Sequence, residues 1–119
     1  MEITKLIEDA HENTINKGFW DAEEEIVDKM EIFGFSEKEI QAVKMAFENQ
    51  RIMLIVTELG EYIEARRNND GSSANEELAD VIIRWADFVG GKGKGKIIKA
   101  IRGKMEKNKI RPRLHGKEF

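Results

Sequence analysis

Two stretches of the chain decide the fold: IMLIVTELGEYI at residues 52–63 and ELADVIIRWADFV at residues 77–89. Wound as helices, both are apolar on nearly every side, which is typical of the central helices of a helical protein. The linker NNDGSSAN between them is short and polar, as in connections between antiparallel helices. We therefore expect an all-α helical bundle around a central antiparallel hairpin, with arms at residues 50–67 and 76–89.

Three helices are expected before the hairpin. Apolar residues at helical spacing predict a first helix from Ile3 to near Gly18, and an acidic second helix follows over residues 21–33. Ser36 and the Glu three residues later form a capping box, in which the two side chains satisfy free backbone amides at a helix start. This motif predicts a third helix that ends near Asn49.

Residues that commonly start or end helices also predict the second arm and the last helix. Ser73 with Glu76 forms another capping box and predicts the start of the second arm. A Gly/Lys loop at residues 90–96 should then precede a last helix, which Pro112 ends. The loop is not a phosphate-binding loop, because Ile97 follows it instead of Ser or Thr and a helix, not a strand, precedes it.

Composition narrows the class of protein. The 119 residues match one domain over 1–119, and 40% hydrophobic with 36% charged residues is too apolar for a disordered chain. The absence of Cys excludes disulfides and thiolate zinc sites and favours a reducing, cytoplasmic location. No run of about 18 apolar residues is present, so we expect no membrane partner.

Four acids interrupt the two most apolar segments. Glu58 and Glu61 on the first arm, and Glu77 and Asp80 on the second, are each spaced i, i+3 and therefore share one helix face. Facing one another across a hairpin, they would repel unless they were protonated or neutralised by a cation. Carboxylate oxygens select a hard ion, so the quartet is interpreted as a site for Mg²⁺, with Mn²⁺ as the alternative.

The charge is divided unevenly along the chain. Residues 1–89 hold 9 Lys and Arg against 21 Asp and Glu, whereas residues 90–119 hold 11 against 2. A nucleic-acid binding module that uses the basic segment 92–117 is therefore the main alternative function. Residues 90–119 contain a single aromatic residue, Phe119, which argues against base stacking and makes a nucleic-acid partner less favoured. A helical interaction protein whose acidic helices pair with a partner is a second alternative.

The acidic pairs and several other motifs of the chain resemble those of the MazG-like nucleotide pyrophosphohydrolases. Glu58-Leu-Gly-Glu61 followed by Glu77-Leu-Ala-Asp80 is similar to the paired acidic motifs of that family. Lys104-Met-Glu-Lys-Asn108, Arg111-Pro112 and His115-Gly-Lys117 resemble the C-terminal signature of its small members. His11 and Trp20 stand nine residues apart, like the base-contacting His and Trp of the related dCTP pyrophosphatases.

The resemblance implies an activity and roles for these residues. A nucleoside triphosphate, with a pyrimidine deoxynucleotide as one candidate, would be hydrolysed to monophosphate and pyrophosphate with Mg²⁺ held by the quartet. Glu61 is the preferred proton acceptor among the four acids. His11 and Trp20 would contact the base, unless Trp20 is a core residue and His11 only a satisfied histidine at a helix surface. Lys104, Asn108 and Arg111, at i, i+4 and i+7 of the last helix, would contact the phosphates, with Lys104 also serving catalysis, unless they form only a solvated basic stripe.

Two features depart from the family pattern. Thr57 stands where many members carry another Glu before the first motif, and residues 21–49 are longer than in compact dCTP-cleaving relatives, as a family-variable insertion would be. The resemblance also implies a homodimer or homotetramer, which agrees with the need to cover two central helices this apolar.

Overall fold

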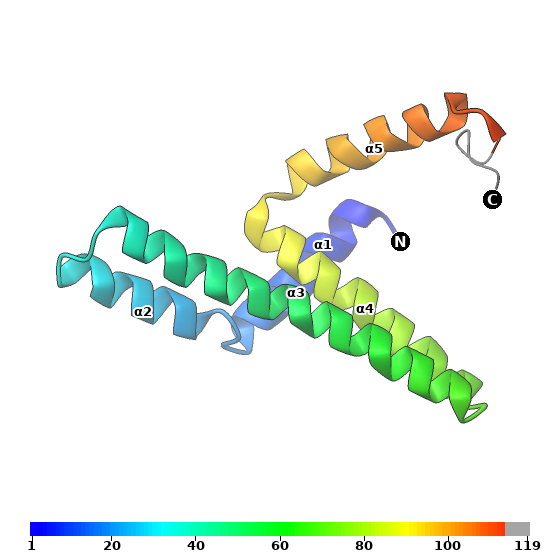
Figure 1. Cartoon of the computed structure of the whole chain (residues 1–119), viewed down its shortest axis with the longest axis horizontal. Helices are drawn as coiled ribbons and strands as arrows, with labels where there is room; N and C mark the ends of the chain where they lie inside the picture. Colours follow the sequence, from blue (N-terminus) through cyan, green and yellow to red (C-terminus); the bar gives the residue numbers. More distant parts are fainter. Residues whose placement is uncertain (114–119) are drawn as a thin grey trace.

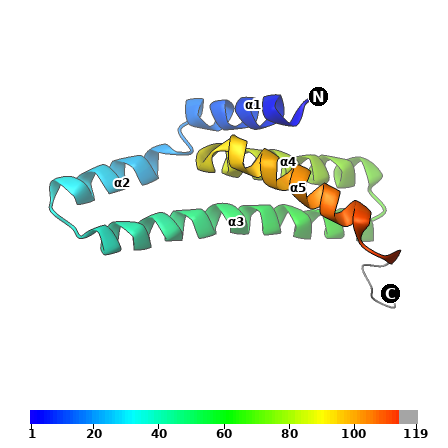
Figure 2. The same ribbon diagram turned by 90° about the horizontal axis from the view of Figure 1, so that it is seen from above.

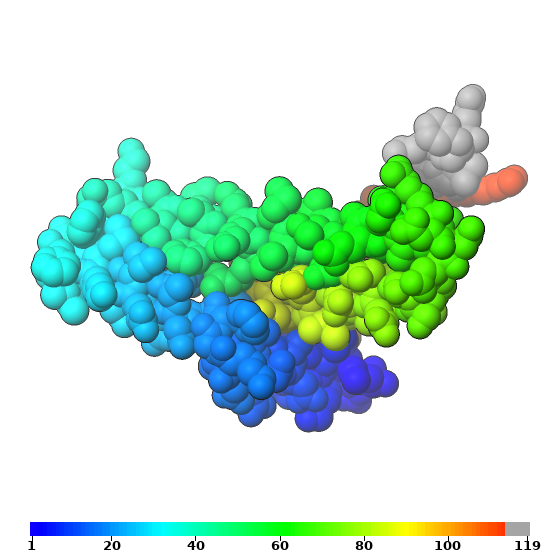
Figure 3. Space-filling view, turned by 90° about the horizontal axis from the view of Figure 1, so that it is seen from below, coloured from blue at the N-terminus to red at the C-terminus, as the bar shows by residue number. Residues whose placement is uncertain are grey.

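The computed structural model describes residues 1–113, and this part of the chain is all-helical, without strands. It forms a helical bundle in which α4 lies between α1 and α3 (Figures 1 and 2). A space-filling view shows the same order of α3, α4 and α1 across the molecule (Figure 3). The five helices are α1 (Ile3–Asn16), α2 (Asp21–Ile32), α3 (Glu37–Arg67), α4 (Gly71–Lys92) and α5 (Lys94–Ile110).

The central hairpin is confirmed, but its first arm is longer than expected. The predicted third helix and the first arm are one continuous helix, α3, of 31 residues. No Gly or Pro separates Asn49 from Ile52, so nothing in the sequence stops the helix there. The capping box at its start is as predicted, since Glu39 N donates to Ser36 Oγ and Ser36 N donates to Glu39 Oε1.

The start of the second arm was predicted wrongly. Helix α4 begins at Gly71, and Asp70 caps it by accepting hydrogen bonds from the backbone N–H and the hydroxyl of Ser73. The expected capping box of Ser73 and Glu76 is therefore not the helix start. An Asp one turn earlier already satisfies the first free amides, which leaves Ser73 inside the helix.

The expected Gly/Lys loop at residues 90–96 is also wrong. Helices α4 and α5 are separated by Gly93 alone, whose φ of +100° favours glycine. Gly90 and Gly91 belong to α4 and lie against the rings of His11 and Trp20. A Cβ on either glycine would clash with those rings, so both glycines allow α1 and the α1–α2 connection to approach α4 closely.

The buried core lies between α1 and α4. Ile7 and Ala10 of α1 pack with Ala86 and Val89 of α4, and partly buried apolar residues surround them, including Ile97 and Ile98 at the start of α5. Beyond this contact α5 diverges from the α3–α4 hairpin (Figure 1). Helix α2 runs along the N-terminal half of α3, so residues 21–49 form an arm that projects from the bundle (Figure 1).

Much of the hairpin's apolar surface is not covered by this chain. Many apolar side chains that the sequence predicts to be buried in the central helices are exposed. They are Ile52, Met53, Leu54, Val56, Leu59 and Ile63 on α3, and Leu78, Ile82 and Ile83 on α4. Helices α1 and α2 cover other faces of the pair. No helix in the described residues is long and apolar enough to cross a membrane.

Replacing a packed glycine and replacing an unpacked one should have opposite effects on stability. Gly91→Ala should lower the free energy of unfolding by about 1–3 kcal/mol, because the new Cβ displaces the Trp20 ring. Gly95→Ala, the matched control on α5, should raise it by about 0.5–1 kcal/mol, because that position is helical with open space around it. Urea unfolding measures both, and equal effects of the two variants would contradict the packing described.

Candidate metal centre and adjoining pocket

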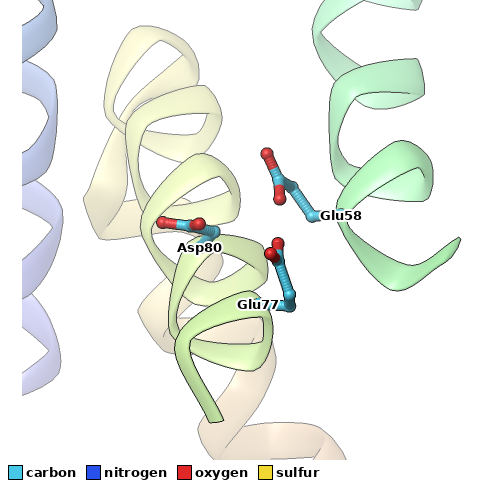
Figure 4. Close-up of side chains that lie close together, drawn as sticks. All are labelled: Glu58, Glu77 and Asp80. Carbon is cyan, nitrogen blue, oxygen red and sulfur yellow. The ribbon is translucent and has the colours of Figure 1, made fainter. Parts of the chain in front are cut away.

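The hairpin brings three of the four predicted acids together. Glu58 of α3 faces Glu77 and Asp80 of α4, and one carboxylate oxygen from each lies within 4.8 Å of the others (Figure 4). The i, i+3 spacing places Glu77 and Asp80 on the side of α4 that meets α3. The antiparallel pairing then sets Glu58 opposite them. How far Glu58 is buried could not be predicted from the sequence.

Two oxygen atoms in this group are buried without a partner. Glu58 is only 7% exposed, and its Oε2, like Oε2 of Glu77, makes no hydrogen bond within the described residues. Buried polar atoms in proteins are almost always satisfied, and an unsatisfied carboxylate oxygen is costly. Carboxylate oxygens converging from two helices are the donor set that Mg²⁺ or Mn²⁺ prefers, so these residues fit the predicted metal.

The acids differ in their electrostatic surroundings. The Arg84 guanidinium, whose Nε donates to Glu58 Oε1 at 2.7 Å, holds the pKa of Glu58 below its ordinary value. The neighbouring carboxylates of Glu61 and Glu58, together with partial burial, raise the pKa of Glu77 to about 7. Glu61 is thus beside Glu77 but exposed, and it is not one of the three closely grouped ligands. Near neutral pH the group holds a proton that a divalent cation would displace.

A pocket of 460 Å³ opens beside the acids, and its wall joins the predicted metal and base residues. Asp80 lines one part of it and Trp20 another, with Arg51, Arg84 and Asp87 as further polar or charged members. Its other lining residues are mainly apolar and come from α1, the α1–α2 connection, the start of α2, α3 and α4. Polar and charged groups that converge in a partly apolar pocket are typical of small-molecule sites.

Asp87 fixes Trp20 and His11, and sequence reasoning missed it. Its Oδ1 accepts from Trp20 Nε1 at 3.0 Å and from the Thr14 hydroxyl at 2.5 Å, and it lies 2.9 Å from His11 Nδ1. His11 meets Trp20 edge to face, with ring centroids 4.9 Å apart. The signal was present, because Asp87 stands two turns after Asp80 on the same face of an apolar helix.

Arg51 is a second residue that the sequence analysis did not single out. Its guanidinium lies over the Trp20 ring, 3.5 Å from the centroid, and its Nη1 donates to Glu23 Oε1 at 3.1 Å. Glu23 belongs to α2, so the projecting arm of residues 21–49 reaches the pocket through this ion pair. A cation over an indole face is attracted by the ring electrons.

The predicted phosphate residues lie elsewhere in this chain. Lys104 and Asn108 are exposed on α5 and Arg111 follows its end, and none of them lines the 460 Å³ pocket. Lys104 instead lines an open hollow along α5 with three other lysines. His115 and Lys117 of the C-terminal motif, and Phe119, lie outside the described residues.

Comparison of the chain with protein-family models, with curated proteins and with solved structures finds no match.

The raised pKa of Glu77 predicts how stability depends on pH. In the folded protein Glu77 keeps its proton up to about pH 7, whereas the unfolded chain releases it near 4.5. The stabilisation is therefore fully present below 4.5 and is lost as the pH rises through about 7. Thermal unfolding in EDTA from pH 5.5 to 8.5 should show this loss, and Glu77→Gln should remove it. Saturating Mg²⁺ should also abolish it, and a wild-type profile identical to that of Glu77→Gln in EDTA would contradict the arrangement.

Proposed function

We propose that this chain is a Mg²⁺-dependent nucleoside triphosphate pyrophosphohydrolase, the activity that its resemblance to the MazG-like family implies. One observation carries the proposal: the carboxylate of Glu58 is buried at the hairpin beside that of Glu77, and each has an oxygen that no group in residues 1–113 partners. A solvated acidic surface would not bury these atoms, and a helix that only pairs with a protein partner has no need of them. The pocket beside the acids supplies space for a substrate.

Each acid has a role in this proposal. Glu58, Glu77 and Asp80 hold the metal, which would neutralise charge on the phosphate oxygens and lower the pKa of the attacking water. Glu61, exposed beside Glu77, accepts the proton of the water that attacks the α-phosphorus. The bond from that phosphorus to the bridging oxygen breaks, and pyrophosphate leaves with the monophosphate as the other product.

The residues of the pocket wall define how a nucleotide would be oriented in the pocket. Its phosphates belong at the Asp80 end and its base at the Trp20 end. Because Trp20 Nε1 and His11 Nδ1 are both directed at Asp87 and Arg51 lies over one face of the indole, we propose that Trp20 offers the other face of its ring to the base instead of its N–H. His11 then fixes the ring edge, and a pyrimidine deoxynucleotide such as dCTP is the first substrate to test.

A second copy of the chain completes the proposal. The exposed apolar side chains of α3 and α4 are the surfaces that a homodimer or homotetramer would bury. Within one chain α5 diverges from the hairpin, so Lys104, Asn108 and Arg111 would reach a triphosphate most directly from a neighbouring copy. In this proposal the basic segment of one copy faces the acidic hairpin of another.

Charge-removing variants of the acids should abolish activity. Glu61→Gln and Asp80→Asn each remove one charge with almost no change in volume, so the fold should remain while pyrophosphate release stops. The assay is pyrophosphate release from a panel of ribo- and deoxynucleoside triphosphates with Mg²⁺ or EDTA. Glu64→Gln is the control, since Glu64 is exposed one turn beyond Glu61 and pairs with Arg67. Hydrolysis at the unmodified rate by either site variant would remove the acids from the mechanism.

The oligomer is tested by mass. Light scattering at micromolar concentration should give a multiple of 13.7 kDa, and Ile82→Glu should reduce it, because a charge on the exposed apolar face of α4 opposes association. Lys38→Glu, an exposed position on the projecting arm and outside both the hairpin face and α5, serves as the control for adding a negative charge. A mass of 13.7 kDa for the unmodified chain would refute the oligomer.

The nucleic-acid alternative rests on the exposed lysines of α5, four of which line one open hollow. Filter binding at low and high salt separates it from the enzyme, because binding through phosphates weakens steeply with salt. Salt-sensitive binding to DNA or RNA that Lys104→Ala removes, with hydrolysis unchanged, would favour the alternative.

A further inference from the structure

Arg84 stands at the boundary between the acidic group and the pocket. It lies one helical turn after Asp80 on α4, and its Nε donates to Oε1 of Glu58 at 2.7 Å. Its side chain is 42% exposed, against 9% for that of Glu58. One end of the ion pair is therefore buried among the acids, while the other is open to solvent at the pocket wall.

The two arginines of the pocket differ in what their guanidinium groups already contact. Arg51 is held by Glu23 and by the face of Trp20. Arg84 makes one hydrogen bond among the described residues, through Nε, so the N–H groups of its two terminal nitrogens have no protein acceptor there. A guanidinium has five N–H donors in a planar fork that matches phosphate oxygens, and the fork of Arg84 is largely unused.

Glu58 is the link between this arginine and the metal. Its Oε1 accepts from Arg84, while its Oε2 is the buried oxygen without a partner. The same carboxylate can thus hold a cation with one oxygen and orient Arg84 with the other. An arginine fixed in this way places positive charge on the pocket side of the metal ligands, where the phosphates of a bound nucleotide belong.

We propose that Arg84 binds the triphosphate of the substrate, with Nε anchored on Glu58 and its terminal nitrogens donating to phosphate oxygens. The inference rests on the proposed function and adds a residue that the MazG-like resemblance did not supply. It also gives the pocket of a single chain a cation for the phosphates, because Lys104, Asn108 and Arg111 do not line that pocket. Arg84 adds to the basic residues of α5 and does not depend on them.

A purely structural role makes a different prediction for Arg84. If Arg84 only supported Glu58, its loss would disturb the acids and weaken binding of Mg²⁺ and of phosphate together. If it binds phosphate, its loss removes a positive charge next to the metal ligands. Mg²⁺ should then bind equally well or more tightly, while the triphosphate binds more weakly. A weaker affinity for triphosphate without a weaker affinity for Mg²⁺ therefore distinguishes phosphate binding from a purely structural role.

The test is calorimetry on the full chain with Arg84→Gln, first with Mg²⁺ alone and then with inorganic triphosphate at saturating Mg²⁺. We expect the Kd for Mg²⁺ to stay the same or fall, and the Kd for triphosphate to rise by about tenfold to a hundredfold. The kcat/KM should fall by a similar factor for every nucleotide, since all share the triphosphate. Arg67→Gln is the control, because Arg67 is an exposed arginine at the far end of α3.

Arg84→Lys is the second variant, for the case that Arg84→Gln does not fold. It keeps the charge but loses the planar fork, so triphosphate affinity should still fall several-fold.

Unchanged triphosphate affinity in the folded variants, or a parallel loss of affinity for Mg²⁺ and triphosphate, would overturn the inference. An unmodified chain that binds Mg²⁺ and triphosphate but releases no pyrophosphate from any nucleotide would overturn the proposed function and leave the role of Arg84 standing. An unmodified chain that binds no triphosphate would overturn both.

Discussion

Glu58 lies where α3 meets α4, and an unpaired charge buried at a contact between such apolar helices costs on the order of several kcal/mol. Arg84 offsets this cost at one carboxylate oxygen only. The other oxygen has no partner in the described part of the chain, and neither has Oε2 of nearby Glu77, whose proton partly relieves the repulsion between the two carboxylates. The hairpin is therefore less stable without a bound cation than with one. A cation between its arms would bind the carboxylate oxygens that have no partner in the described residues.

Helix α4 combines the structural and chemical roles of the molecule. Its small residues Ala86 and Val89 face α1 and form the core with Ile7 and Ala10. Along a different side it carries Glu77, Asp80, Arg84 and Asp87, spaced by three or four residues, so they form one polar stripe on an otherwise apolar helix. The stripe runs from the acids to the anchor of Trp20, and the pocket follows it.

The sequence predicts the helices well because their signals are local. Periodicity and the capping box at Ser36 place α1 to α3, and the polar linker predicts the hairpin. The break between α4 and α5 was misjudged because six of the seven residues at 90–96 lie within the helices, and only Gly93 adopts the conformation that ends α4. Gly90 and Gly91 lack side chains and so leave room for the rings of His11 and Trp20. This contact between distant segments cannot be predicted from the sequence of the segment itself.

The candidate site was predicted in part for the same reason. Acids spaced i, i+3 in apolar helices can be recognised in sequence, and three of the four converge. Asp87, Arg84 and Arg51 were missed because their partners lie in other segments of the chain: Trp20 and His11 for Asp87, Glu58 for Arg84, and Glu23 for Arg51. Which oxygen is buried also depends on packing, which spacing alone does not determine.

The arm formed by α2 and the first half of α3 runs outward and returns, and it is tied to the pocket by the ion pair of Glu23 and Arg51. Because the two helices are antiparallel, removing the same whole number of turns from each beyond Phe47, the outermost pocket residue of the arm, would shorten the arm and keep Glu23 and Arg51 in register. Adding turns would lengthen it in the same way. The arm can therefore change its length in steps while the pocket wall stays unaltered, so this part of the chain can gain or lose residues without reshaping what lies beneath it.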